Sequence, residues 1–210
     1  MNHDLLLERF LRSNQVPFYD GFEPHPETSD FRTFHFSRAL FESASLSVTK
    51  LHGSVNWRRY RPLRARAARD KWRDEFFGIS LKENRAFEKM DELPLVLVGT
   101  FNKILQCSVP VFLQMLGEFD HFLQTTSHLI VCGYGFGDKG INTLLAYWMS
   151  KKTPHTLYVI DPSPFNETRC RGAISQKVEI WRDENCLKVL PKKLGKGGVT
   201  WTEVLEFAEL

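Results

Sequence analysis

Residues 128–162, HLIVCGYGFGDKGINTLLAYWMSKKTPHTLYVIDP, decide the fold class of this chain. The segment opens with the apolar run HLIVCGY, continues with INTLLAYWMSKK, a segment of helical character that ends in lysines, and closes with the apolar run TLYVIDP. Continuous apolar runs of this length are typical of parallel strands that are covered on both faces, and a helix between two of them makes a βαβ unit. The sequence therefore predicts an α/β fold with a Rossmann-like, mostly parallel sheet.

The glycine-rich turn GYGFGD, residues 133–138, lies between the first strand and the helix. Glycines allow positive φ and a close approach of the backbone to a ligand, and a helix N-terminus attracts phosphate. A full G-x-G-x-x-G motif would need glycine where Asp138 stands, and that carboxylate could cap the helix instead. Two interpretations stay open: contact with the ribose or adenine of a nucleotide, or a plain strand-to-helix turn. Asp161 ends the next strand, where a carboxylate can accept ribose hydroxyls.

The flanking sequence predicts further elements around this unit. Apolar spacing predicts a helix over 5–11 and another over 111–127. Strand-type runs are LPLVLVGT (93–100), QKVEIWRD (176–183) as the last strand, and the β-rich segments 31–37 and 45–53.

A basic segment covers residues 58–73, with eight basic side chains against one acidic residue. After Pro62, residues 63–77 favour a helix. One interpretation is a solvated helix with Trp72 and Phe76 packed inward, and the other is a surface that binds nucleic acid. We favour the first, because basic stripes on amphipathic helices are common and a net charge of +3 is small for a nucleic-acid partner.

Composition excludes several other classes. A hydrophobic fraction of 42% over 210 residues is that of a packed domain, and no apolar run approaches the roughly 20 residues that cross a bilayer. The N-terminus lacks the features of a signal peptide, so we expect a cytoplasmic protein. The four cysteines form no C-x-x-C pair, which argues against zinc and against a disulfide framework.

The stretch KLHGSVNW, residues 50–57, places His52 at the end of a β-rich segment, followed by a glycine that opens space beside it. A histidine in that position suits a general base. A structural histidine is the alternative, and by itself the pattern favours it.

Together, several stretches resemble the sirtuin-like (silent-information-regulator-like) NAD-consuming family, over most of the chain. The zinc-free bacterial branch, often linked to NAD hydrolysis in anti-phage defence, is the most similar. The stretches are NHDLLLE (2–8), FYDGF (18–22), KLHGSVNW (50–57), VGTFNK (98–103) and CGYGFGDKGINTLL (132–145).

The resemblance implies roles for particular residues. His52 would be the catalytic base on the ribose hydroxyls, Asn2 would position the nicotinamide ribose or the attacking water, and Asp4 would support Asn2. His52, Asn2 and the glycine turn would then line one ribose pocket. The nucleotide would contact Gly133, Tyr134, Gly135, Phe136 and Asp161.

Two departures from the family shape the expectation. No C-x-x-C pairs follow His52, and an Arg-rich helical insertion, residues 58–92, takes the place of the zinc module; this favours NAD hydrolysis over deacylation. The family's first strand and G-A-G-x-S phosphate loop are not found before Asn2. We therefore expect residues 1–210 to be a single, N-terminally truncated sirtuin-like domain that lacks the first strand or strands and the phosphate loop.

The expected ligand is NAD, as substrate, or ADP-ribose, and a homo-oligomer or a partner domain is compatible with the sequence. We expect no metal, no membrane and no nucleic acid as partner. The alternative function is a non-catalytic or incomplete fragment that binds a nucleotide or a partner without turning over NAD.

Overall fold

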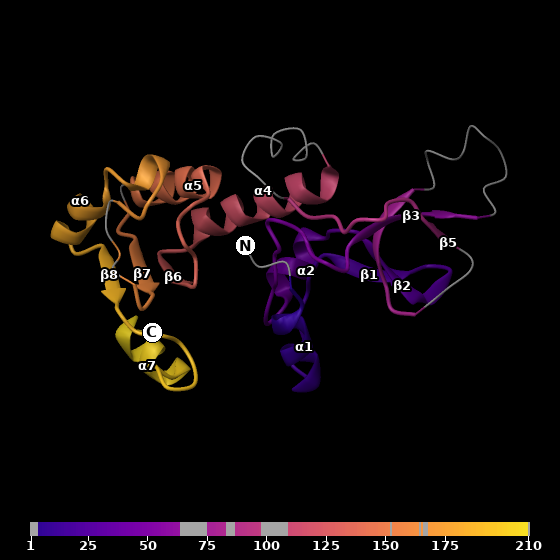
Figure 1. The fold of residues 1–210 in the computed structure, drawn as a ribbon, viewed down its shortest axis with the longest axis horizontal. Coiled ribbons are helices and arrows are strands. Elements are labelled where there is room, and N and C mark those ends of the chain that lie inside the picture. The colour runs from indigo at the N-terminus through magenta and orange to yellow at the C-terminus, as the bar shows by residue number, and fades with distance from the viewer. Residues whose placement is uncertain are drawn as a thin grey trace. The chain divides into compact units, whose positions relative to one another are not determined.

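A computed structural model of the chain describes residues 4–63, 75–82, 87–97, 109–151, 153–163, 165 and 168–209. The chain divides into two compact units, Met1–Phe119 and Asp120–Leu210. In Figure 1 the first unit begins in indigo, and the second ends in yellow at its last helix.

The first unit is built on an antiparallel sheet. Its strands lie in the order β1-β2-β4-β3-β5, and each neighbouring pair is antiparallel. The elements are α1 (Leu6–Ser13), β1 (Phe22–His25), β2 (Thr28–Phe34), α2 (Arg38–Ser43), β3 (Arg58–Pro62), β4 (Phe76–Ser80), β5 (Phe87–Lys89) and the start of α4 (Pro110–Thr125). Only Pro26 and Glu27 separate β1 from β2, and a two-residue connection joins strands in the antiparallel sense.

Two apolar clusters support this sheet. The larger cluster joins the strands to α4. Its buried members are Phe22, Trp57, Ile79, Leu97, Val111, Phe112 and Met115. The smaller is aromatic: the Phe31 ring lies 4.9 Å from both Tyr60 and Phe87, measured between ring centroids. Aromatic pairs of this geometry contribute about 0.5–1.5 kcal/mol each beyond the area they bury.

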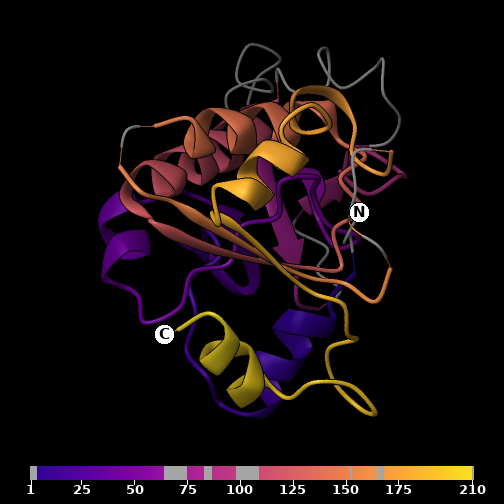
Figure 2. The same ribbon diagram turned by 90° about the vertical axis from the view of Figure 1, so that its left-hand side faces the viewer.

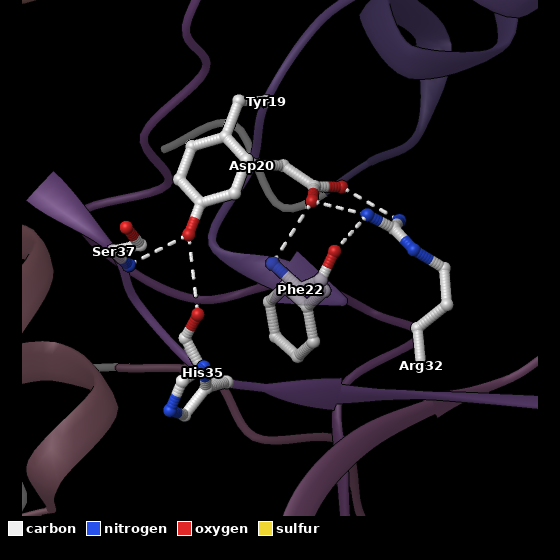
Figure 3. A network of polar contacts seen from close by, with 6 residues as sticks. All are labelled: Tyr19, Asp20, Phe22, Arg32, His35 and Ser37. Atoms are coloured by element: carbon white, nitrogen blue, oxygen red, sulfur yellow. Dashed lines mark hydrogen bonds and ion pairs between the residues drawn. The ribbon is translucent and has the colours of Figure 1, made fainter. Parts of the chain in front are cut away.

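A polar network fastens the chain before β1 to β2 and the residues after it, as Figure 3 shows. The Asp20 carboxylate accepts hydrogen bonds from the Arg32 guanidinium at 2.6 and 2.9 Å and from Phe22 N at 3.1 Å. Arg32 also donates to the Phe22 carbonyl oxygen. The Tyr19 hydroxyl accepts from Ser37 N at 2.7 Å and donates to the His35 carbonyl oxygen at 3.1 Å. These polar groups are partnered within the protein, so the network has a structural role.

The second unit is built on a parallel sheet of three strands in the order β6-β7-β8. Its elements are β6 (His128–Cys132), α5 (Lys139–Met149), β7 (Thr156–Ile160), the 3₁₀ turn η1 (Gly172–Ile174), α6 (Val178–Asp183), β8 (Leu187–Leu190) and α7 (Trp201–Phe207). In Figures 1 and 2, α5 and α6 lie on one side of these strands and α7 on the other.

Strand β7 is central and buried on both faces, which explains its continuous apolar sequence. Leu157 to Ile160 are each at most 1% exposed. On the face covered by α7, Ile160 packs in a cluster with Val199 and Val204, and the Tyr158 ring lies 5.7 Å from that of Phe207.

The structure confirms the βαβ unit that the sequence predicts. The predicted strands and helix of 128–162 are β6, α5 and β7, and the predicted helices near 5–11 and 111–127 are α1 and α4. The α/β class is therefore correct.

A mostly parallel sheet, however, is not found among the described residues, because the five strands of the first unit pair antiparallel and only three strands are parallel. Within the predicted helical insertion 58–92, the described residues form β3, β4 and β5, which corrects that expectation. The most arginine-rich part, 64–74, lies outside the described residues.

The predicted last strand, QKVEIWRD, is wrong. Residues Val178–Asp183 form helix α6, and the last strand is β8, Leu187–Leu190. Val178 and Trp181 are buried while Ile180 is 46% exposed, so the buried residues follow helical spacing and not strand alternation. Of the predicted strand LPLVLVGT, residues 93–97 contain only an isolated bridge, Gly53 to Val96, and 98–100 lie outside the described residues.

Across the described ranges, no helix has the length and apolar character needed to cross a membrane.

Candidate functional site

The His52 segment of the first unit is a turn and not a strand, which corrects the expected strand end. Gly53 N donates to the Lys50 carbonyl oxygen at 3.1 Å and closes the turn. Two further backbone bonds pin it to the chain before α4: Leu97 N donates to the His52 carbonyl oxygen at 2.9 Å, and Ser54 N donates to the Leu95 carbonyl oxygen at 3.2 Å. His52 is half-buried on this bonded turn.

Gly53 is required by this geometry. Its φ of +80° is in the left-handed region, and a Cβ built at this position would lie 2.1 Å from the Leu95 carbonyl oxygen. The glycine therefore lets the backbone beside His52 approach the neighbouring segment closely.

A buried ammonium group links the His52 turn to the N-terminal helix. Lys50 Nζ lies 2.6 Å from Glu8 Oε1 and 3.0 Å from Ser54 Oγ, and it also donates to the Asp4 carbonyl oxygen. The structure thus brings the backbone of Asp4 to the His52 turn; that Asp4 and His52 form one site stays a prediction. Asn2, the other predicted residue of this segment, lies outside the described residues.

The sequence did not indicate Lys50 as a site residue, nor Glu8 and Ser54 as the acceptors that contact its ammonium group. All three are in the stretches that carry the family resemblance, 2–8 and 50–57. Their pairing joins positions more than forty residues apart in sequence, so no local pattern indicates it.

In the second unit, the glycine turn opens the helix α5 with its first N–H groups already bonded. Asp138 Oδ1 accepts from Gly140 N at 2.9 Å and from Ile141 N at 3.4 Å, so the predicted cap is confirmed. A capping carboxylate occupies the position that a phosphate would take at a helix N-terminus. Among the described residues, no atom lies within 4 Å of a Cβ built on Gly135 or Gly137, which leaves space beside the turn.

Phe136 anchors the middle of the turn. Its φ is +51°, rare for a residue with a side chain, and its side chain is fully buried, with ring centroids 4.7 Å from those of Tyr134 and Phe165. Asn142 Nδ2 donates to the Phe136 carbonyl oxygen at 2.8 Å and to the Arg171 carbonyl oxygen at 2.6 Å. Phe136 could therefore contact a ligand only through its backbone.

Tyr134 also helps to hold the glycine turn in place. Its hydroxyl lies 2.9 Å from Asn142 Oδ1 and 3.2 Å from the Asp138 carbonyl oxygen. Burial raises the pKa of this hydroxyl far above its ordinary value, so it remains a neutral donor. Asn142 belongs to the quoted stretch 132–145, but its role as the clamp of the turn appears only in the structure.

Asp161 and the glycine turn lie at the same edge of the parallel sheet. Cys132 pairs with Ile160 in register, so Gly133 and Asp161 follow directly from neighbouring strand ends. Asp161 Oδ2 accepts from Arg169 at 2.6 Å and Oδ1 accepts from Ser163 N at 2.8 Å. The Arg169 hydrogen bond, followed by that from Ser163, holds the pKa of the Asp161 carboxyl below its ordinary value despite burial. The carboxylate stays ionised and oriented, with lone pairs left for a further donor.

Replacing Arg169 with methionine should lower stability in a pH-dependent way. Because the folded-state pKa of Asp161 is lowered, the stabilisation is complete above the ordinary Asp pKa of about 3.9 and is lost as the pH falls through the lowered folded value. We expect the variant to be less stable than the wild type by about 1.5–3 kcal/mol at pH 7, with a difference that narrows as the pH falls below the ordinary Asp pKa of about 3.9. Urea unfolding of both proteins from pH 7 to pH 3 measures it; a deficit that is constant with pH would contradict the ionic role, and Arg169→Lys should recover part of the loss.

The predicted residues thus form two groups. Asp4 and His52 belong to the first unit, and Gly133, Tyr134, Gly135, Phe136 and Asp161 belong to the second. That the two groups line one ribose pocket stays a prediction. Within the described residues, no group of three or more His, Cys, Asp or Glu side chains is placed to hold a metal ion.

The β6–α5–β7 unit, with a glycine-rich turn and an oriented carboxylate at the carboxyl edge of the strands, has the arrangement of the α/β proteins that bind nucleotides at this edge. The model of the SIR2-like domain family matches residues 1–186. This chain therefore belongs to the SIR2-like domain family, which confirms the resemblance to sirtuins and implies the use of NAD. No curated protein matches the chain significantly.

Proposed function

We propose that this chain hydrolyses NAD to nicotinamide and ADP-ribose. His52 acts as the base on the ribose hydroxyls, Asn2 positions the ribose or the attacking water, and Asp4 supports Asn2. The observation that carries the proposal is the His52 turn, which is closed by Gly53, bonded to residues 95–97 and linked through Lys50 to Asp4. A general base contributes most when its support holds it in one position.

The chemistry needs few groups. The C1′–N bond of NAD breaks, and its electron pair goes to the cationic nicotinamide ring, which leaves as a neutral molecule without a general acid. The positive charge that develops on the ribose is stabilised when His52 withdraws a proton from a ribose hydroxyl. Water then bonds to C1′ and releases one proton to solvent, and His52 returns to the ribose hydroxyl the proton that it had withdrawn.

The second unit has, by itself, groups that suit the sugars of a nucleotide. Gly133, Tyr134 and Gly135 would line a ribose, with space beside the glycines, and the oriented Asp161 carboxylate would accept hydrogen bonds from the adenosine ribose. Because Asp138 occupies the first N–H groups of α5, we assign sugar and not pyrophosphate to this turn. The resemblance to zinc-free bacterial relatives extends the proposal to NAD depletion in anti-phage defence.

Incubation of the purified chain with NAD tests the proposal. We expect nicotinamide and ADP-ribose in equal amounts, at a rate that does not depend on an added acyl-lysine peptide. Release that requires the peptide would indicate deacylation. Binding of NAD without release would support the alternative, a nucleotide-binding module without turnover.

A further inference from the structure

The charged cluster around Lys50 is the most deeply buried ionic group beside the predicted catalytic residues. The side chains of Lys50 and Glu8 are only 9% and 8% exposed, and Ser54 is fully buried. The ammonium has three donors, and Glu8, Ser54 and Asp4 each provide an acceptor.

Burial of the Lys50–Glu8 pair does not by itself stabilise the fold more than apolar side chains would. Two desolvated charges regain in attraction little more than they lose in hydration, and apolar side chains of similar volume often stabilise as well or better. The acceptors lie in two separate segments: Asp4 and Glu8 are at the start of α1, and Ser54 is in the His52 turn. The ammonium therefore defines the distance between these segments, which two apolar side chains would not do.

We propose that Lys50 is a positioning residue that holds the Asp4 segment against the His52 turn, with Glu8 fixing its ammonium. This inference rests on the proposed function, in which Asp4 supports Asn2, the predicted catalytic residue two positions earlier in the chain. Asp4 is itself linked to the helix, because its Oδ1 accepts from Leu6 N at 2.9 Å. The Lys50 ammonium offsets the cost of burying the Glu8 carboxylate. Glu8 Oε2 is buried and has no hydrogen-bond partner in the described part of the chain.

The double variant Lys50→Met/Glu8→Leu separates positioning from stability, because it removes both buried charges and keeps the volume. We expect it to melt close to the wild type, whereas Lys50→Met alone leaves Glu8 unpaired and melts lower. For nicotinamide release we expect kcat of the double variant to fall about 10- to 100-fold, as for a catalytic group misplaced by about 1 Å, while KM changes much less. Lys50→Arg, which keeps the charge, should recover part of kcat.

A matched control is another ion pair of this unit, Asp20 with Arg32, whose side chains are 12% and 21% exposed. Asp20→Leu/Arg32→Met should change the melting temperature without lowering kcat. A stable Lys50→Met/Glu8→Leu variant with the wild-type kcat would overturn the inference, as would an equal loss of kcat in the control.

Hydrogen exchange tests the inference without activity. In the double variant we expect the Leu6 amide, which donates to Asp4, to exchange faster than in the wild type while amides of the sheet are unchanged; equal exchange at Leu6 would overturn the positioning role. A wild-type chain that releases no nicotinamide would contradict the proposed function, and the exchange result would still decide whether Lys50 holds Asp4.

Discussion

Replacement of His52 with alanine is expected to lower the rate of nicotinamide release by about 10²- to 10⁴-fold, which is the contribution typical of a positioned general base. The backbone of the turn remains bonded in the variant, because Leu97 N donates to the carbonyl oxygen at position 52 and not to the side chain. We therefore expect a nearly unchanged melting temperature. Initial rates at saturating NAD, with a melting curve for each protein, measure both effects.

His35 provides the matched control, because it is in the same unit and its side chain is 77% exposed. His35→Ala should keep the wild-type rate. A His52→Ala variant that releases nicotinamide at the wild-type rate would remove His52 from the mechanism. His52→Gln, which retains a polar side chain but no base, should be as slow as His52→Ala.

Replacement of Gly53 with alanine is expected to have the largest effect on stability. A Cβ there would meet the Leu95 carbonyl oxygen at 2.1 Å, and the φ of +80° disfavours any side chain. The left-handed conformation alone costs about 1–2 kcal/mol, and the contact with backbone cannot be relieved by a rotamer change. We expect a total loss of more than about 3 kcal/mol in chemical denaturation, together with loss of nicotinamide release.

Gly135→Ala is the control for this substitution. A Cβ at Gly135 would have no atom of the described part of the chain within 4 Å, and the φ of this residue is outside the left-handed region. Its free energy of unfolding should therefore stay within about 1 kcal/mol of the wild-type value. If Gly53→Ala were as stable as Gly135→Ala, the close contact between the His52 turn and Leu95 would not exist in solution.

Local sequence signals predicted the second unit well where the structure depends on local interactions. The apolar run of β7 is buried on both faces, as a central parallel strand requires. Asp138 caps α5 because a side-chain oxygen at that position bonds N–H groups two and three residues later. Such features involve residues only a few positions apart, so a pattern can indicate them.

The same reasoning failed where similar local patterns lead to different structures. Residues 178–183 have the β-branched and aromatic content of a strand, but the burial of Val178 and Trp181 on one side makes them a helix. The strands of the first unit pair antiparallel, although the apolar runs and the βαβ unit predicted a mostly parallel sheet. Strand direction depends on which segments pair, and pairing is a property of the whole fold.

Residue types at short spacing were enough to predict the α/β class, the glycine turn before α5, its cap and the family. The turn at His52, the need for glycine at position 53 and the link from Lys50 to Glu8, Asp4 and Ser54 became evident only from the folded chain. Except for the bond from Lys50 to Ser54, these contacts connect segments about forty residues apart. Their energies depend on burial and close approach, which exist only after the chain has folded.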